Sequence, residues 1–111
     1  MRIFFDQGTP VPLRHHLPGR QISTAYELGW GSLENGELLQ QAENHGFEIL
    51  ITTDRNLKYQ QNLASCRIAV VVLSTTSWPR IKSAIPAVLN TVNNAHRKSY
   101  IEVSIPYVER G

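Results

Sequence analysis

Five short blocks along the chain have the residue types of β-strands, and the stretches between them contain Gly, Pro, Asn or Asp. The blocks are rich in branched and aromatic residues, which favour β-strands, and they cover residues 2–5, 21–26, 47–52, 68–73 and 100–105. The fourth block does not alternate, which is typical of a central strand buried on both faces. The fifth alternates between apolar and polar positions and indicates an edge strand.

Helical spacing and capping residues predict four helices between these strands. The predicted helices span residues 9–17, 35–44 and 55–64, and the longest begins at Trp78-Pro79. Strands that alternate with helices imply a parallel sheet covered on both faces. The pattern therefore predicts an α/β fold, a three-layer α/β/α sandwich around a mostly parallel five-stranded sheet.

The composition fits one domain that spans residues 1–111 and has a core of its own, since 41% of the residues are hydrophobic. A net charge of +2 neither excludes nucleic acid nor argues for it. The single Cys66 excludes an internal disulfide and every multi-cysteine zinc site, and it fits a reducing compartment.

The longest apolar run covers residues 68–73. It is far shorter than the ~20 residues that a membrane helix needs. Asp6 interrupts the apolar N-terminus, so no signal peptide is expected. These features predict a soluble cytoplasmic protein without a membrane partner.

The two aspartates of the chain occupy equivalent places in the predicted topology. Asp6 directly follows the first strand and Asp54 follows the third, while Glu34 and Glu37 flank the start of the second helix. Ligands of open α/β sheets bind beyond the carboxyl ends of the strands, so neighbouring strands would bring both aspartates to one crevice. A hard divalent cation would relieve the repulsion between such carboxylates, lower the pKa of a bound water and hold a phosphate for in-line attack.

Helix capping is the simpler interpretation of these aspartates. An Asp after a strand commonly caps the next helix, and both Asp6 and Asp54 precede a predicted helix. Capping explains each residue singly, but it does not explain why the only two aspartates share one topological place.

Three segments resemble PIN-like nucleases. Residues 1–6 (MRIFFD) are similar to the first strand of that family, which ends in Asp, and residues 49–57 (ILITTDRNL) resemble its Thr-x-Asp-x-Asp-Phe segment. Residues 35–39 (NGELL) stand where the family carries Asp-Glu-Glu-Leu-Leu. The resemblance extends to about Leu73 and is nearest to short PIN-like proteins encoded beside small antitoxin-like genes.

The resemblance implies a metal-dependent endoribonuclease, the toxin of a toxin–antitoxin pair held by a small antitoxin protein. Asp6, Glu37 and Asp54 would hold Mg²⁺ or Mn²⁺ and carry the catalysis, with Glu34, Asn35 and Asn56 as additional ligands. Asn35 and Asn56 depart from the family, which usually has Asp at both positions. An asparagine adds no negative charge, so the alternative is a catalytically degenerate PIN-like module that binds RNA or a protein.

Five residues are candidates for RNA contacts. Cations attract phosphate, and aromatic rings stack on bases; the candidates are Arg14, Arg20, Arg55, Lys58 and Tyr59. The alternative for the last three is a solvated helix face. Trp30 lies in a Gly-rich loop, where it is either a stacking platform or a cover over the core.

Two further hypotheses remain open. Response-regulator receivers also carry an Asp after strand three, acids after strand one and Ser or Thr after strand four, as Asp54, Asp6 and Ser74-Thr75 do here. Their second acid after strand one and their Lys after strand five have no counterpart. The predicted edge strand over residues 100–105 also favours a homodimer.

Overall fold

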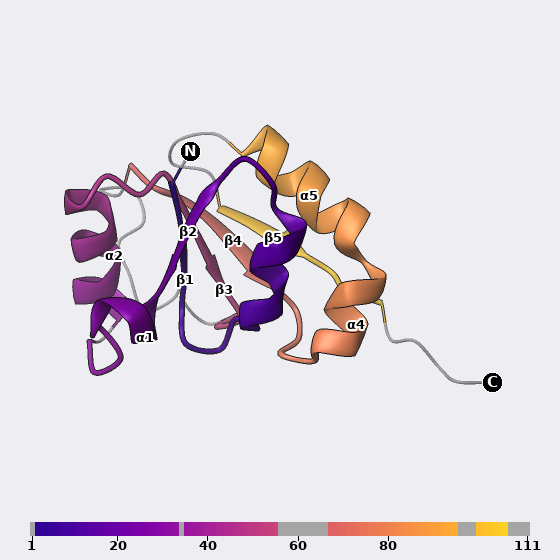
Figure 1. Ribbon diagram of the computed structural model, residues 1–111, viewed down its shortest axis with the longest axis horizontal. Helices are drawn as coiled ribbons and strands as arrows, with labels where there is room; N and C mark the ends of the chain where they lie inside the picture. Colours follow the sequence, from indigo (N-terminus) through magenta and orange to yellow (C-terminus); the bar gives the residue numbers. More distant parts are fainter. Residues whose placement is uncertain (1, 34, 56–66, 96–99, 107–111) are drawn as a thin grey trace.

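A computed structural model of the protein describes residues 2–33, 35–55, 67–95 and 100–106. Five strands form one sheet of order β2-β1-β3-β4-β5, and every neighbouring pair is parallel (Figure 1). The strands are β1 (Arg2–Phe5), β2 (Gln21–Thr24), β3 (Ile49–Thr52), β4 (Ala69–Leu73) and β5 (Tyr100–Val103). The predicted α/β class and the five strands are confirmed, and the sheet is entirely parallel.

Helical segments connect β1 to β2, β2 to β3 and β4 to β5, as is usual between parallel strands. They are the 3-10 helix η1 (Val11–His16) and the α-helices α1 (Ala25–Leu28), α2 (Asn35–Asn44), α4 (Trp78–Ser83) and α5 (Ile85–Asn94). The helix predicted over residues 55–64 lies outside the described residues, except for Arg55, which is in a turn.

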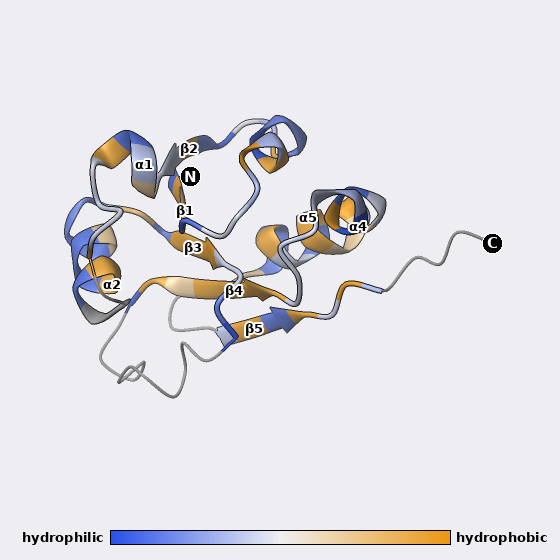
Figure 2. Ribbon diagram, turned by 90° about the horizontal axis from the view of Figure 1, so that it is seen from below, coloured by the Kyte–Doolittle hydropathy of each residue, from blue (hydrophilic) through white to orange (hydrophobic). Residues whose placement is uncertain are grey.

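Side chains pack against both faces of the sheet. Ile3, Phe5 and Ile51 face the side covered by η1, α4 and α5, whereas Phe4 and Leu50 face the side covered by α1 and α2 (Figure 2). All five residues of β4 are buried, which confirms the central strand predicted from its lack of alternation. β5 lies at one edge of the sheet, as its alternation predicted.

The second strand is shorter than predicted because a helix begins inside the predicted range. The Thr24 hydroxyl accepts the N–H of Glu27, and the Glu27 carboxylate accepts the N–H of Thr24. This capping box starts α1 at Ala25. The prediction of strand at residues 25 and 26 is therefore wrong.

The longest predicted helix is two helices. Ala84 has φ −115° and ψ 20°, outside helical geometry, and separates α4 from α5. Pro86 follows in the first turn of α5, where its missing N–H costs nothing. A proline inside one continuous helix would remove a hydrogen bond and clash with the preceding turn. The break therefore follows from Pro86.

Candidate functional site

β1 and β3 are neighbours in the sheet, and this brings the chain segments of the two aspartates together. Phe5 pairs with Ile51, and the N–H of Asp6 donates to the Ile51 carbonyl at 3.0 Å. β1 is flanked by β2 on its other side, so the chain order reverses between β1 and β3. Open α/β sheets bind ligands outside such a reversal point, at the carboxyl ends of the strands.

The Asp6 carboxylate is held by two donors. Oδ1 accepts the N–H of Gln7 at 2.7 Å, and Oδ2 accepts the hydroxyl of Thr52 at 2.9 Å. The residue is half-buried. Since a carboxylate offers about four acceptor positions, each oxygen keeps capacity for a ligand while its orientation is fixed.

Thr52 links the two aspartates. Its side chain is completely buried, and its hydroxyl donates to Asp6 while it accepts the N–H of Asp54 at 3.1 Å. Asp54 is half-buried and has at least one further interaction of its own. A chain of hydrogen bonds therefore crosses the carboxyl ends of β3 and β1. It runs from the backbone N–H of Asp54 to the Thr52 hydroxyl and on to the Asp6 carboxylate.

Other loops close around this chain of hydrogen bonds. A Cβ at Gly8 would collide with the Thr53 hydroxyl, and a Cβ at Gly31 would lie 2.5 Å from Nε2 of Gln7. The turn after β1 therefore lies against both the end of β3 and the loop after α1. The contact with Thr53 favours glycine at position 8, whereas the flexible end of the Gln7 side chain could move away from a side chain at position 31.

Thr9 fixes the turn that carries Asp6 and does not cap a helix as predicted. Its buried hydroxyl donates to the Ile51 carbonyl at 2.9 Å, and its N–H donates to the Asp6 carbonyl at 3.0 Å. The N-cap of η1 is Pro10, without a side-chain cap. The capping interpretation of Asp6 is therefore wrong.

Replacement of Thr9 by valine should lower the free energy of unfolding by about 1–3 kcal/mol, because it removes a hydrogen bond at a buried site. Urea denaturation measures this loss. Thr91→Val is the matched control, since the Thr91 hydroxyl also donates to a carbonyl, Ala87 on α5, at 2.9 Å but in an exposed setting. A loss of similar size in both variants would contradict the proposed fixing of the Asp6 turn.

Glu37 does not join the aspartates. It is exposed in the first turn of α2, and within the described parts of the chain no three His, Cys, Asp or Glu side chains come together as metal ligands. Asn35 begins α2 as predicted. Glu34, Asn56 and the side chain of Asn35 lie outside what the structure describes.

The predicted RNA-binding arginines are not gathered at one place. Arg14 holds Glu27 through two bonds, at 2.6 and 3.2 Å, and donates to the Ile22 carbonyl. Arg20 directly precedes β2, at the opposite edge from Asp6, and donates to Pro18 and Asn93. Arg20 therefore lies at the amino end of the sheet, apart from Asp6.

Arg55 stands beside Asp54 and is exposed. It lines a cavity of about 100 Å³ together with Ser74 and Ser104, at the carboxyl ends of β4 and β5. Among the candidate arginines, Arg55 is the one that directly adjoins an aspartate in the sequence. Lys58 and Tyr59 lie outside the described residues.

The Arg14–Glu27 pair shifts the titration of both groups. The Arg14 hydrogen bond, followed by the N–H of Thr24, lowers the pKa of Glu27 below its usual 4.5, and the Glu27 bond raises the pKa of Arg14. A lowered carboxyl pKa stabilises the fold above the unfolded-state pKa, and this contribution disappears as the pH falls through the folded-state pKa.

Wild-type protein should therefore melt at a higher temperature than Glu27→Gln at pH 7, and this difference should shrink as the pH falls below about 4.5. Thermal melting of both proteins between pH 7 and 3 measures it. Comparison with Glu48→Gln, an exposed carboxylate just before β3, separates the effect from general acid unfolding. A difference that stays constant down to pH 3 would refute the role of the ion pair.

Charge is distributed unevenly along the chain, a signal that the individual motifs do not show. Residues 1–54 hold seven acidic and three basic residues, whereas residues 55–111 hold two acidic and eight basic residues. No acidic residue occurs between Asp54 and Glu102. Counting charge on each side of Asp54 would have revealed that a basic segment begins directly at the candidate site.

The two tryptophans cover the core. The Trp30 ring lies 5.4 Å from the ring of Phe4 and contacts Phe47 and His45, so Trp30 covers the core and is not a free stacking platform. Trp78 packs against His16 and the core on the other face.

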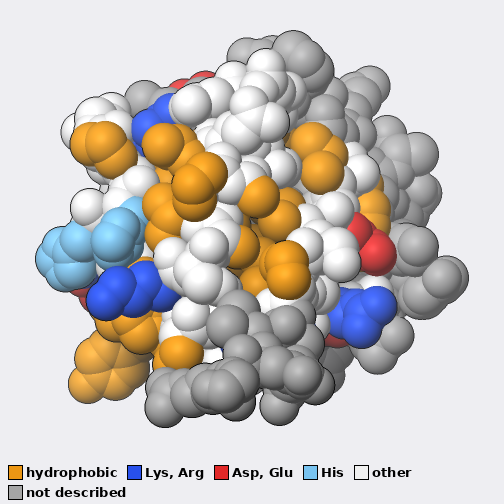
Figure 3. Space-filling view, turned by 90° about the vertical axis from the view of Figure 1, so that its right-hand side faces the viewer, with side chains coloured by type: hydrophobic (Ala, Val, Ile, Leu, Met, Phe, Trp, Pro, Cys, Tyr) orange, Lys and Arg blue, Asp and Glu red, His pale blue; other side chains and the backbone are white. Residues whose placement is uncertain are grey.

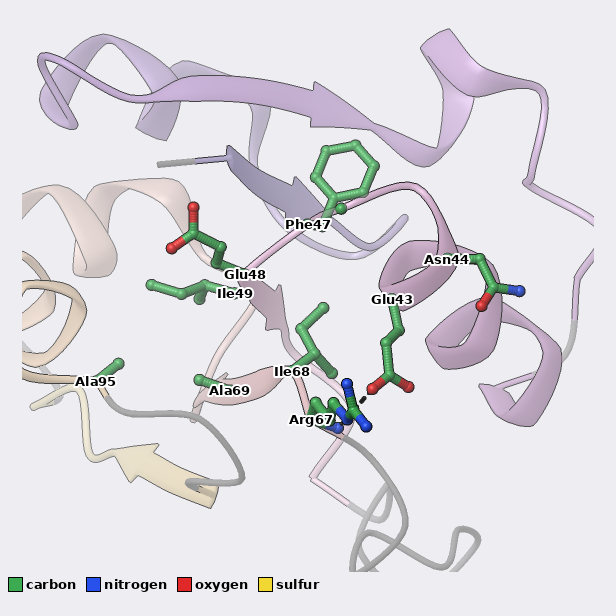
Figure 4. A pocket seen from close by; sticks show the side chains of 10 residues that line it. Glu43, Asn44, Phe47, Glu48, Ile49, Arg67, Ile68, Ala69 and Ala95 are labelled. Atoms are coloured by element: carbon green, nitrogen blue, oxygen red, sulfur yellow. Dashed lines mark hydrogen bonds between the residues drawn. The ribbon is translucent and has the colours of Figure 1, made fainter.

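A separate cavity of about 510 Å³ lies at the amino ends of β3 and β4. Figure 4 shows Glu43 and Arg67 at one side and Ile49, Ile68 and Ala69 as its apolar floor. The N–H of Arg67 donates to Glu43 at 2.8 Å. This cavity is at the opposite end of the strands from Asp6, so it is not part of the candidate site.

The receiver-like alternative shares some of this geometry. Ser74 and Thr75 follow β4, two strands from β1, but both hydroxyls accept backbone N–H groups, from Ile105 and Ser77 respectively. No lysine occurs in or directly after β5, through residue 106. The phospho-acceptor function stays a prediction without further support.

No helix within the described ranges is long and apolar enough to cross a membrane. Comparisons with protein-family models, with curated proteins and with solved structures find no match to this chain.

Proposed function

We propose that the protein is a Mg²⁺- or Mn²⁺-dependent endoribonuclease, a three-layer α/β/α sandwich of the PIN-like type. The observation that carries the proposal is the hydrogen-bonded chain from Asp54 through Thr52 to Asp6 at the reversal point of the sheet. Helix capping does not account for Asp6. The buried Thr52 hydroxyl orients the Asp6 carboxylate, which supports a functional role for that carboxylate.

The residues present fit a hard divalent cation. The side-chain oxygens that could hold an ion at these strand ends belong to Asp6, Asp54 and Thr53, and Mg²⁺ prefers oxygen ligands. Mg²⁺ commonly binds through one or two carboxylates, keeps several waters and takes substrate phosphate as another ligand. Two aspartates therefore suffice for one ion, without Glu37, which is exposed and stands apart from them.

The bound ion would supply an activated water and neutralise charge on the phosphate. The protein's part is positioning: Thr52 and the Gln7 N–H fix the Asp6 carboxylate, while the glycine contacts of the turn keep it against β3. Arg55, beside Asp54, contributes a cation for the phosphodiester backbone.

The partners proposed are RNA, a small antitoxin protein and a second copy of the chain. Hydrophobic side chains lie across the centre of the face that carries α4 and α5, and few charged groups interrupt them (Figure 3). Exposed or half-exposed apolar residues there include Pro79, Ile85, Pro86 and Leu89. An apolar face of this kind suits a protein partner. The sedimentation mass of the protein, measured with and without a candidate antitoxin, tests whether it binds such a partner or a second copy of itself.

A catalytically degenerate PIN-like module is the second candidate function. It is favoured by Asn35 and Asn56 and by the exposed position of Glu37 apart from the aspartates. Such a module would bind RNA or a protein without cleaving it, and its binding would not depend on a divalent cation.

Cleavage of a mixed single-stranded RNA pool in Mn²⁺, in Mg²⁺ and in EDTA separates the two candidates. We expect cleavage with a divalent cation, none in EDTA, and none with Asp54→Asn purified in parallel, which controls for contaminating ribonuclease. RNA binding that persists in EDTA without cleavage in either metal would replace the nuclease by the binding module.

A further inference from the structure

Tyr26 is 90% exposed, an unusual state for a tyrosine in a folded domain. Within the described ranges the other large hydrophobic residue with high exposure is Val11, at 49%. Aromatic side chains contribute most of their stabilisation by burial. A tyrosine held in water therefore contributes little to this fold and is available for a ligand.

The helix that presents Tyr26 is one turn long, yet it is fixed at both ends. The capping box of Thr24 and Glu27 closes its start, and the Arg14 guanidinium holds Glu27 through two bonds. Gly29 adopts φ 72° at its end, where the N–H donates to the Tyr26 carbonyl at 3.2 Å. An isolated turn would not form a stable helix, so these contacts hold the Tyr26 backbone in place.

Tyr26 lies at the same edge of the sheet as the aspartates. Phe5 pairs with Thr24, so the chain leaves β1 at Asp6 and leaves β2 at Ala25 from neighbouring positions. The order of the strands places α1 and the ends of β1, β3 and β4 in succession along the carboxyl edge (Figure 1). Asp6 directly follows β1, and Asp54 lies two residues after the end of β3. Neighbouring strands lie about 4.8 Å apart, so Tyr26 is within reach of a nucleotide chain that crosses Asp6.

The other end of this edge carries groups that suit a phosphodiester backbone. Arg55, Ser74 and Ser104 line the cavity of about 100 Å³ at the ends of β4 and β5. Glu102 lines it too, and its carboxylate accepts the Tyr100 hydroxyl at 3.3 Å. Single-stranded nucleic acid is bound by base stacking and by phosphate contacts. The edge offers both, because an aromatic ring lies at one end of the aspartate pair and a cation with hydroxyls lies at the other.

We infer that Tyr26 is a base-stacking platform for single-stranded RNA that runs along the carboxyl edge, across Asp6 and Asp54 toward Arg55. The inference deepens the proposed function and rests on it for the choice of RNA. A rigid helix turn that presents an aromatic ring loses little conformational entropy when a base stacks on it. The stacking tolerates any base, so the platform contributes affinity rather than sequence preference.

The test measures RNA binding apart from cleavage. Fluorescence anisotropy of labelled 12-nucleotide RNA in Mg²⁺, with Asp54→Asn as the background, compares Tyr26→Ala, Tyr26→Phe and Gln21→Ala. Gln21 is exposed at the amino end of β2 and is the control at the opposite edge. Loss of one stacked base should weaken binding about tenfold in Tyr26→Ala, whereas Tyr26→Phe and Gln21→Ala should stay within twofold.

A series of RNAs that each lack one base locates the contact. In the protein that has Tyr26, removal of the base at one position of the RNA should weaken binding about tenfold. In Tyr26→Ala, removal of the same base should have no further effect. Binding by Tyr26→Ala within twofold of the parent, or by Tyr26→Phe as weak as by Tyr26→Ala, overturns the platform. A change of sedimentation mass in Tyr26→Ala with unchanged RNA binding also overturns it and assigns the residue to a protein contact.

The outcomes separate this inference from the proposed function. Tyr26-dependent binding without metal-dependent cleavage by the wild type refutes the nuclease and leaves the platform standing. Cleavage that is lost with Asp54→Asn but is unaffected by Tyr26→Ala, in rate and in KM, refutes the platform and leaves the nuclease standing.

Discussion

Replacement of Asp6 by asparagine should reduce metal-dependent RNA cleavage by about 10³-fold while the protein keeps its fold. Stabilisation of phosphate charge by a bound ion contributes several kcal/mol to such reactions, and each 1.4 kcal/mol changes the rate tenfold. Asparagine has the shape of aspartate and its carbonyl oxygen still accepts one of the two hydrogen bonds, from Gln7 or from Thr52. The loss therefore reports the negative charge rather than the local structure.

Initial cleavage rates at saturating Mn²⁺, with melting temperature as the check on folding, measure this loss. Asp54→Asn should match Asp6→Asn, because the Thr52 hydroxyl joins the two residues at one site. Glu37→Gln is the matched control for loss of a carboxylate at the same edge, and we expect a loss of about tenfold at most, because Glu37 is exposed and apart from the pair. Equal losses in all three variants would show that the ligand set is wrong.

The sequence predicts the fold where hydrophobic burial decides it. A strand buried on both faces leaves a continuous apolar run, so β4 is visible in the sequence, and the alternation of β5 marks an edge. The errors lie where a few side chains override the pattern. Thr24 and Glu27 convert the end of a strand into a helix turn, and Pro86 divides a continuous apolar helix pattern.

The candidate site is predicted in part for a similar reason. That Asp6 and Asp54 follow strands is visible in the sequence, but their closeness depends on the strand order, which places β3 beside β1. The contribution of Thr52 cannot be seen, because a threonine at the end of a strand is an ordinary strand residue. Its bond to Asp6 joins residues 46 positions apart and exists only in the folded register.

The sequence does not mark Tyr26 as a candidate, because a sequence does not record exposure. In the block from residue 21 to 26 a tyrosine resembles any other strand residue, and only the one-turn helix after Thr24 turns it toward water. The capping box that shortens the predicted strand and the exposed tyrosine are thus two consequences of one local interaction.

Replacement of Thr52 by valine should weaken metal binding and cleavage by about 10- to 100-fold, the usual effect of losing a residue that orients a metal ligand. Valine fills the completely buried position with nearly the same volume, but it leaves Asp6 Oδ2 and the N–H of Asp54 without their partner. The unfolding free energy should also fall by about 1–3 kcal/mol, because polar groups near the core lose a hydrogen bond.

Thr52→Ser separates positioning from packing, since serine keeps the hydroxyl and removes the methyl group. We expect Thr52→Ser to lose stability but to retain cleavage and Mn²⁺ affinity within about threefold of wild type, whereas Thr52→Val loses both functions. Mn²⁺ titration by calorimetry gives the affinity independently of turnover. If Thr52→Val binds Mn²⁺ as wild type does, Asp6 needs no orientation by Thr52, and the hydrogen-bonded chain is then a structural feature of the sheet edge.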